Sequence, residues 1–154
     1  MHKLLNQVRD LELIEEELNA NPVGVMALLS DGEKVSQVAT TFLYRDKNIF
    51  IFFGNDDELN ERLQFNSKVI FTVLRYNHVK KNTEINFDPT YNLFYISISG
   101  IIKKIDEQKL IEDLRQKFIK KYKKRASDDY DLSLLSNVAM IDSEEIQAFT
   151  EMGG

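Results

Sequence analysis

Four runs of hydrophobic residues, separated by short polar stretches, occupy the stretch between Val23 and Val73. Val23–Leu29 is almost wholly apolar, and Val35–Leu43 alternates β-branched with polar residues. Ile49–Phe53 reads IFIFF, and Val69–Val73 reads VIFTV. Each run has the length and the β-branched or aromatic content of a strand, so this part of the chain predicts four strands.

The polar stretches between these runs predict how the strands connect. Asp31-Gly32 suits a tight hairpin turn and Arg45–Asn48 a second one, so the first three strands are expected to form a meander. Between the third and fourth runs, Asn55 followed three residues later by Glu58 predicts the start of a short helix. Asn66-Ser67 predicts its end.

Before the first strand, residues Lys3–Ala20 carry apolar side chains at helical spacing and predict an amphipathic helix that ends at Asn21-Pro22. After the fourth strand, the polar run Asn77–Tyr91 has no periodicity and predicts a long loop or hairpin tip.

The C-terminal half repeats the strand and helix signals. Leu93–Ile105 predicts a strand in which Gly100 indicates a bulge or a close backbone approach. Asp106 is expected to cap a helix whose buried stripe contains Leu110, Ile111, Leu114, Phe118 and Tyr122. A polar turn at Ala126–Asp131 leads to a last apolar run, Val138–Ile141.

Five or six mostly antiparallel strands with helices at the periphery predict a mainly β, α+β chain that forms a closed or split β-barrel. Regular strand–helix alternation, which a doubly wound parallel sheet requires, is missing. A length of 154 residues is expected to form a single domain, residues 1–154.

Composition and charge narrow the function classes. The chain has no cysteine and a net charge of -5, so we expect a cytoplasmic protein without a thiolate metal site and without general nucleic-acid binding. We also expect no membrane span and no signal peptide. The basic residues at the end of the last helix are either partners of the helix dipole or a patch that binds phosphate or nucleic acid: Lys117, Lys120, Lys121, Lys123, Lys124 and Arg125.

The order of these elements resembles the pyridoxamine 5'-phosphate oxidase-like family of FMN-binding split barrels. The similar segments are VGVMALLS, the turn DG, VSQVATTFLY, NIFIFF, the short helix ending RLQFNS, VIFTV and YISISGIIKKID. They span roughly Leu4 to Phe149, and none of them is a specific signature on its own.

This resemblance implies a homodimer that binds FMN in clefts between its two chains, with the flavin supplying the chemistry. The cofactor-binding positions that it implies are Gln37, Val38, Thr40, Phe53, Gly54, Asn55, Glu58 and Arg62. It assigns no catalytic residue. The two histidines, His2 and His78, are too few and too far apart in the sequence for a metal site.

The phosphate-binding positions depart from the family pattern. Family members hold the phosphate with basic side chains on the second strand, here near Ser36, Gln37 and Val38, none of which is basic. They also use a lysine at the start of the short helix, a position that falls in this chain at Asp57, Glu58 or Leu59. Backbone N–H groups after Asn55 and the guanidinium of Arg62 are the remaining phosphate donors; otherwise the segment is a capped surface helix with a Glu58–Arg62 pair.

Two functions therefore stay open from the sequence. One is an FMN-dependent oxidoreductase of the pyridoxamine 5'-phosphate oxidase-like type, with FMN binding weakened by the missing basic residues. The other is a barrel that has lost FMN and binds haem, another flavin or a protein partner. The sequence names no substrate, because the loops that would form a substrate pocket carry no motif.

Overall fold

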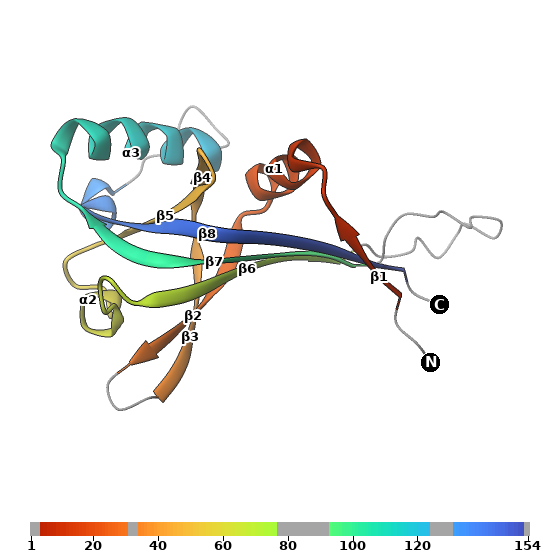
Figure 1. The fold of residues 1–154 in the computed structure, drawn as a ribbon. Helices are drawn as coiled ribbons and strands as arrows, with labels where there is room; N and C mark the ends of the chain where they lie inside the picture. The colour runs from red at the N-terminus through yellow and green to blue at the C-terminus, as the bar shows by residue number, and fades with distance from the viewer. Residues whose placement is uncertain (1–3, 31–33, 77–92, 124–130, 153–154) are drawn as a thin grey trace.

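The computed structural model describes residues 4–30, 34–76, 93–123 and 131–152. Within them, the strands form one antiparallel sheet in the order β3-β2-β6-β7-β8-β5-β4, and β1 pairs with β8 beside this path (Figure 1). The strands are β1 (Leu4–Val8), β2 (Val23–Ser30), β3 (Lys34–Thr41), β4 (Leu43–Arg45), β5 (Asn48–Phe53), β6 (Lys68–Tyr76), β7 (Leu93–Ile105) and β8 (Asn137–Met152).

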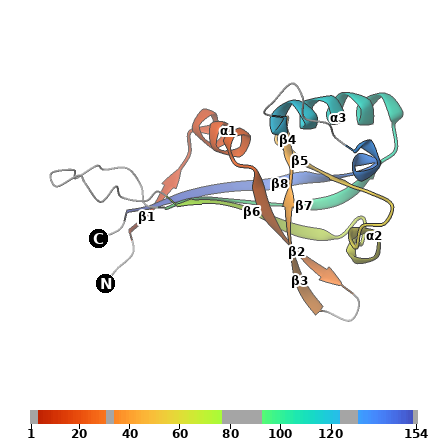
Figure 2. The same ribbon diagram turned by 180° about the vertical axis from the view of Figure 1, so that it is seen from behind.

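The helices among the described residues lie around this sheet. They are α1 (Leu11–Ala20), α2 (Leu59–Arg62), α3 (Gln108–Tyr122) and the 3-10 turn η2 (Leu132–Leu135). Views from the front and from behind place α1 and α3 over the same side of the long β7–β8 pair (Figures 1 and 2). No helix in the described part of the chain is long and apolar enough to cross a membrane.

The chain itself curls the sheet into a barrel. The two end strands of the sheet, β3 and β4, are separated in sequence by one residue, Phe42. Since consecutive residues must lie next to each other, the two edges of the sheet meet at Phe42, which is completely buried. The ring of Phe42 packs edge-on against that of Phe71, with centroids 5.0 Å apart, inside the barrel. The predicted split β-barrel is confirmed.

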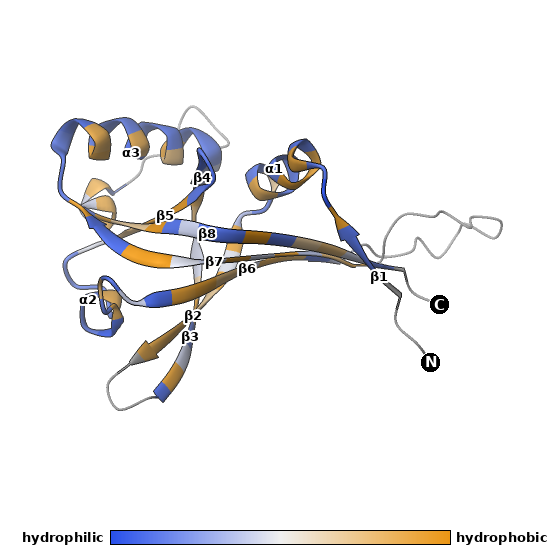
Figure 3. Cartoon of the chain, in the orientation of Figure 1, coloured by the Kyte–Doolittle hydropathy of each residue, from blue (hydrophilic) through white to orange (hydrophobic). Residues whose placement is uncertain are grey.

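Strand β5 is covered on both of its faces, which explains its unbroken hydrophobic sequence. Ile49, Ile51 and Phe53 point into the barrel core, whereas Phe50 and Phe52 pack beneath α3. The buried residues of α3 that complete this second cluster are Ile111, Leu114 and Phe118. Figure 3 shows the matching alternation of hydrophobic and hydrophilic residues along α3. A strand buried on two faces needs no polar positions.

The last turn of α3 holds the chain where the barrel edges meet. The Tyr122 hydroxyl accepts the backbone N–H of Phe42 at 3.0 Å and lies 2.7 Å from the Pro22 carbonyl and 2.8 Å from the Phe42 carbonyl. The Lys121 ammonium donates to the Phe42 carbonyl at 3.0 Å and lies 3.7 Å from the centre of the Phe42 ring. Burial lowers the pKa of Lys121 to about 8.

Several sequence predictions are confirmed. The strands predicted at Val23–Leu29, Ile49–Phe53, Val69–Val73 and Leu93–Ile105 form where expected. The β4–β5 hairpin closes through Asp46 and Lys47, both at positive φ, as a tight two-residue turn requires. The bulge lies at Gly100, where the pairing of β7 with β8 shifts between Ser99 and Gly100. The turn at Asp31-Gly32, the loop Asn77–Tyr91 and most of the turn at Ala126–Asp131 lie outside the described residues.

The N-terminal helix is shorter than predicted, with 10 residues. Residues Leu4–Val8 form β1, which pairs with Ala148–Met152 of β8. The helix begins only at Leu11, because the Asp10 carboxylate accepts the backbone N–H of Glu12 at 3.0 Å and caps it there. The apolar spacing of residues 3–20 could not show that these residues have a strand partner, because that partner, β8, lies at the other end of the chain.

Other predicted boundaries were also wrong. The strand Val35–Leu43 divides at Phe42, and β5 pairs with β4 and β8, so the first three strands do not form a simple meander. Helix α3 starts after Glu107, and Asp106 does not cap it. The final strand extends well beyond Val138–Ile141 because β7 and β1 pair with its second half.

Candidate functional site

The segment after β5 brings together two of the regions that the sequence singles out. Helix α2 follows β5 and reaches the edge of β3, where the Arg62 guanidinium donates to the Gln37 carbonyl at 3.3 Å. The same guanidinium lies 3.9 Å from the Glu58 carboxylate, one helical turn away. The predicted Glu58–Arg62 pair is therefore confirmed, and it is exposed enough to contribute only a few tenths of a kcal/mol.

Helix α2 is much shorter than predicted, because the segment before it folds on its own polar groups. Asn55 does not start the helix; the Asp57 carboxylate accepts the backbone N–H of Leu59 at 2.9 Å. The Asn60 amide donates to the carbonyls of Gly54 at 2.8 Å and of Asn55 and Asp57 at 3.0 Å each. These contacts hold a tight turn rather than a longer helix.

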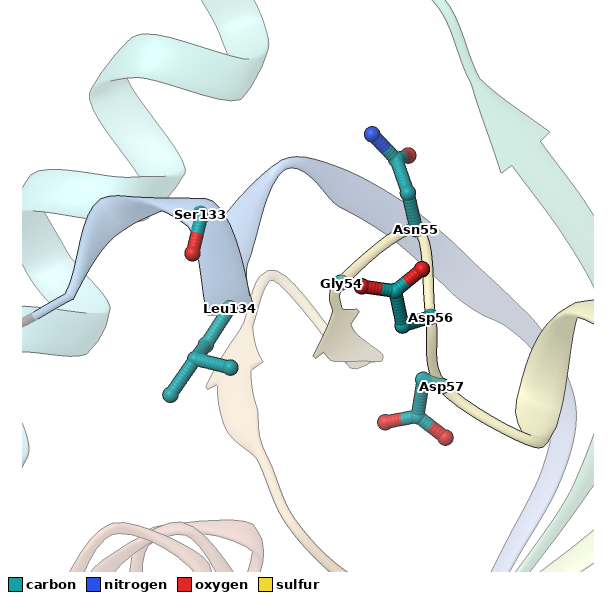
Figure 4. Close-up of a pocket in the computed structure, with 6 residues that line it drawn as sticks. All are labelled: Gly54, Asn55, Asp56, Asp57, Ser133 and Leu134. Atoms are coloured by element: carbon teal, nitrogen blue, oxygen red, sulfur yellow. The ribbon is translucent and has the colours of Figure 1, made fainter.

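A pocket of about 440 Å³ opens between this turn and η2. Figure 4 shows the carboxylates of Asp56 and Asp57 along one wall, with Ser133 and Leu134 on the other. Gly54 lies where the two walls meet. A Cβ atom there would lie 2.9 Å from the Ser133 carbonyl oxygen, so only glycine fits without a shift of the backbone. Asn55, also a lining residue, accepts a hydrogen bond from the Asn137 amide at 2.8 Å.

A second pocket, of about 350 Å³, adjoins the first on the side of α3. Its wall contains Phe53, Asn60 and Asn137, and at its rim the Lys104 ammonium lies 3.8 Å from the Asp106 carboxylate. The charge of Lys104 is thus partly balanced by a neighbouring carboxylate.

The structure groups some of the predicted site residues and separates others. Gln37, Glu58 and Arg62 lie together at the contact between β3 and α2. Phe53, Gly54 and Asn55 lie at the end of β5 and line the two pockets. Val38 packs against the barrel core, and Thr40 donates its hydroxyl proton to the Thr41 carbonyl at 3.0 Å. Because side chains alternate along a strand, Gln37 faces away from Val38 and Thr40.

Three residues at the site were not predicted from the sequence. Ser133, Leu134 and Asn137 come from η2 and the start of β8, some eighty residues after the turn that they face. The sequence Asp131-Leu132-Ser133 held one local signal, since the Asp131 carboxylate accepts the Ser133 backbone N–H at 3.0 Å, a recognisable start of a turn. Nothing local indicated which part of the chain that turn would face.

The outer face of β2, β3 and β6 is apolar and exposed. Register pairs Ala27 with Gln37 and with Ile70, which places alternate residues of the three strands on one surface. The large hydrophobic residues of this outer face, each between 37% and 71% exposed, are Val23, Val25, Leu29, Val35, Ile70, Leu74 and Tyr76. An apolar surface of this extent is typical of an interaction face.

No protein-family model matches the sequence, and no curated protein matches it. Solved structures do match. A candidate 5-nitroimidazole antibiotic resistance protein from Bacteroides thetaiotaomicron aligns with a TM-score of 0.77 at 12% identity, over 98% of this chain and 90% of its own. A FAD-binding protein from Mesorhizobium loti aligns with a TM-score of 0.64 at 18% identity, over 97% and 99%.

A candidate pyridoxamine 5'-phosphate oxidase from Corynebacterium glutamicum aligns with a TM-score of 0.65 at 13% identity, over 100% of this chain and 99% of its own. At such identities these likenesses show the fold. The chain has the split-barrel fold of pyridoxamine 5'-phosphate oxidase-like proteins, as the sequence predicted, and its neighbours in fold include flavin-binding proteins.

The residues at α2 do not fit the phosphate of an FMN. The N–H groups of Leu59 and Asn60 donate to the side chain and the carbonyl of Asp57, so they do not point at a ligand. Arg62 already contacts Glu58 and the Gln37 carbonyl. One unsatisfied group does remain on β3: the Ser36 hydroxyl is buried and has no hydrogen-bond partner among the described residues. A neutral hydroxyl suits an uncharged part of a ligand at least as well as a phosphate.

Proposed function

We propose that this protein is a homodimeric flavin-binding split barrel that acts as a flavin-dependent oxidoreductase, with FMN as the flavin implied by the family resemblance. The observation that carries the proposal is the fold itself, which a FAD-binding protein and a candidate pyridoxamine 5'-phosphate oxidase share over nearly their whole length. A bound flavin would carry the electron transfer, while the protein would bind and orient it.

The outer face of β2, β3 and β6 supports the dimer. Val25, Ile70 and Leu74 lie on this face with 37%, 48% and 58% of their surface exposed. Pairing this face with that of a second copy would remove apolar surface from water, at roughly 25 cal/mol for each Å². A symmetric contact of one face with itself is the commonest arrangement in homodimers.

Ile70→Asp should break the dimer. A carboxylate placed in the middle of an apolar interface must lose its hydration without a partner, so the dimer dissociation constant should rise by about 100-fold or more. Light scattering at micromolar concentration should give a dimer mass for the wild type and a monomer mass for the variant.

The matched control is Gln116→Asp, which adds the same side chain on the exposed side of α3, away from the outer face. It should leave the dimer intact. A monomer mass for the wild type would contradict the proposed dimer and any binding site formed between two copies.

Flavin binding is tested by titrating FMN and riboflavin with the protein and following quenching of flavin fluorescence. We expect saturable quenching by the wild type with one flavin per chain. Ile70→Asp should quench far less, because a flavin between two copies loses half of its contacts when the copies separate. Equal binding by the dimer and by the monomeric variant would contradict a site at the interface.

A second candidate function is a barrel that has lost FMN and binds haem, another flavin or a protein partner. The acidic turn at Asp56, Asp57 and Glu58 favours it, because it replaces the lysine expected for a phosphate. The same titration separates the two candidates: under this second function the protein does not quench the fluorescence of FMN.

A further inference from the structure

The turn before α2 is strongly acidic. Between Asp56 and Arg62 the chain carries four carboxylates, those of Asp56, Asp57, Glu58 and Glu61, and one guanidinium. All four carboxylate residues are exposed. Two of them, Asp56 and Asp57, lie along the wall of the pocket shown in Figure 4.

The pocket wall offers no cation to balance the charges of Asp56 and Asp57. The six residues that line the pocket include no basic side chain. The nearest guanidinium, that of Arg62, donates to the Gln37 carbonyl and lies beside Glu58. Lys104 belongs to the adjoining pocket and lies 3.8 Å from Asp106.

The backbone does not replace the missing cations. The Asp57 N–H donates to the Gly54 carbonyl at 3.3 Å, and the N–H groups of Leu59 and Asn60 both donate to Asp57. A ligand that approached this turn would meet two carboxylates, and these three N–H groups are already engaged within the turn. A phosphate carries close to two negative charges at neutral pH, and the two exposed carboxylates together would weaken its binding by about tenfold.

We propose that Asp56 and Asp57 are specificity residues that turn the site away from phosphorylated flavins and towards a flavin whose side chain ends in neutral hydroxyls. This inference rests on the proposed function, because it assumes that a flavin binds beside α2. It goes beyond that function by naming the class of flavin: riboflavin, which lacks the phosphate, should bind at least as tightly as FMN.

The experiment compares dissociation constants of riboflavin and FMN for the full-length protein by fluorescence titration. For the wild type, riboflavin should bind about 3- to 30-fold more tightly than FMN. The variant Asp56→Asn/Asp57→Asn keeps the size of both side chains and an oxygen that can accept the Leu59 N–H. It should tighten FMN binding by about tenfold and leave riboflavin binding nearly unchanged.

Two further measurements separate a charge effect from a structural one. Raising the salt concentration should narrow the wild-type difference between the two flavins, since salt screens exposed charges, and should affect the double variant less. Glu112→Gln, which removes a carboxylate from the exposed side of α3, should leave the ratio of the two dissociation constants as it is in the wild type.

Each outcome decides one claim. If FMN binds the wild type more tightly than riboflavin, or if the double variant changes both flavins alike, the inference is wrong while flavin binding stands. If neither flavin binds, the proposed function fails and the inference fails with it.

Discussion

Gly100→Ala should lower the free energy of unfolding by about 3 kcal/mol, the largest effect that we expect from a single added methyl group. A Cβ atom at this position would lie 2.3 Å from the backbone carbonyl oxygen of Asp142 and 3.0 Å from the Ser143 Cα. Both are backbone atoms of β8, so neither can rotate away. The backbone at the bulge between β7 and β8 must move apart instead. These two strands pair along the whole length of β7, so the change disturbs a long ladder of the sheet.

Urea unfolding followed by circular dichroism measures this effect. The control is Ser99→Ala on the neighbouring residue of β7, which removes a half-buried hydroxyl and should change the stability by no more than about 0.5 kcal/mol. A Gly100→Ala variant as stable as this control would mean that the bulge accommodates a side chain and that the register of β7 and β8 differs from the one described.

Glu58→Lys should tighten FMN binding by about 1 to 3 kcal/mol, since it removes a repulsion and adds a charge-assisted contact to the phosphate. It also releases Arg62, whose guanidinium now lies 3.9 Å from the Glu58 carboxylate. The cost to the protein is small, because the lost pair is exposed. Riboflavin should respond much less than FMN.

Fluorescence titration at low and moderate salt checks this result, and the gain for FMN should shrink as salt rises. Glu61→Lys is a useful comparison, because it makes the same charge change on α2 outside the position at which the family comparison places a lysine. An equal response of both flavins, or none, would show that the segment Asn55–Arg62 is only a capped surface turn.

The sequence predicted the barrel because its central strands carry their own signals. IFIFF in β5, the alternation of β3 and the two-residue turn at Asp46 and Lys47 are all local, and each one formed as expected. The bulge at Gly100 was also predictable from the sequence, because a glycine inside a strand often marks a bulge or a close backbone approach. The errors arose where a partner far along the chain decided the outcome.

Strand β1 is the clearest example of such an error. Its residues fit a helical pattern as well as a strand, and only the long free edge of β8 selects the strand. At the site, the contact between Arg62 and Gln37 agrees with the two regions that the resemblance singled out. The opposite wall, formed by Ser133 and Leu134, depends on where η2 packs, and no local pattern encodes that position.

The visible absorbance spectrum of the protein, purified without added ligand and then desalted, tests the central claim most directly. We expect a yellow protein whose flavin absorbance survives desalting and whose flavin is released on denaturation. A colourless protein that also fails to quench the fluorescence of both FMN and riboflavin would contradict it.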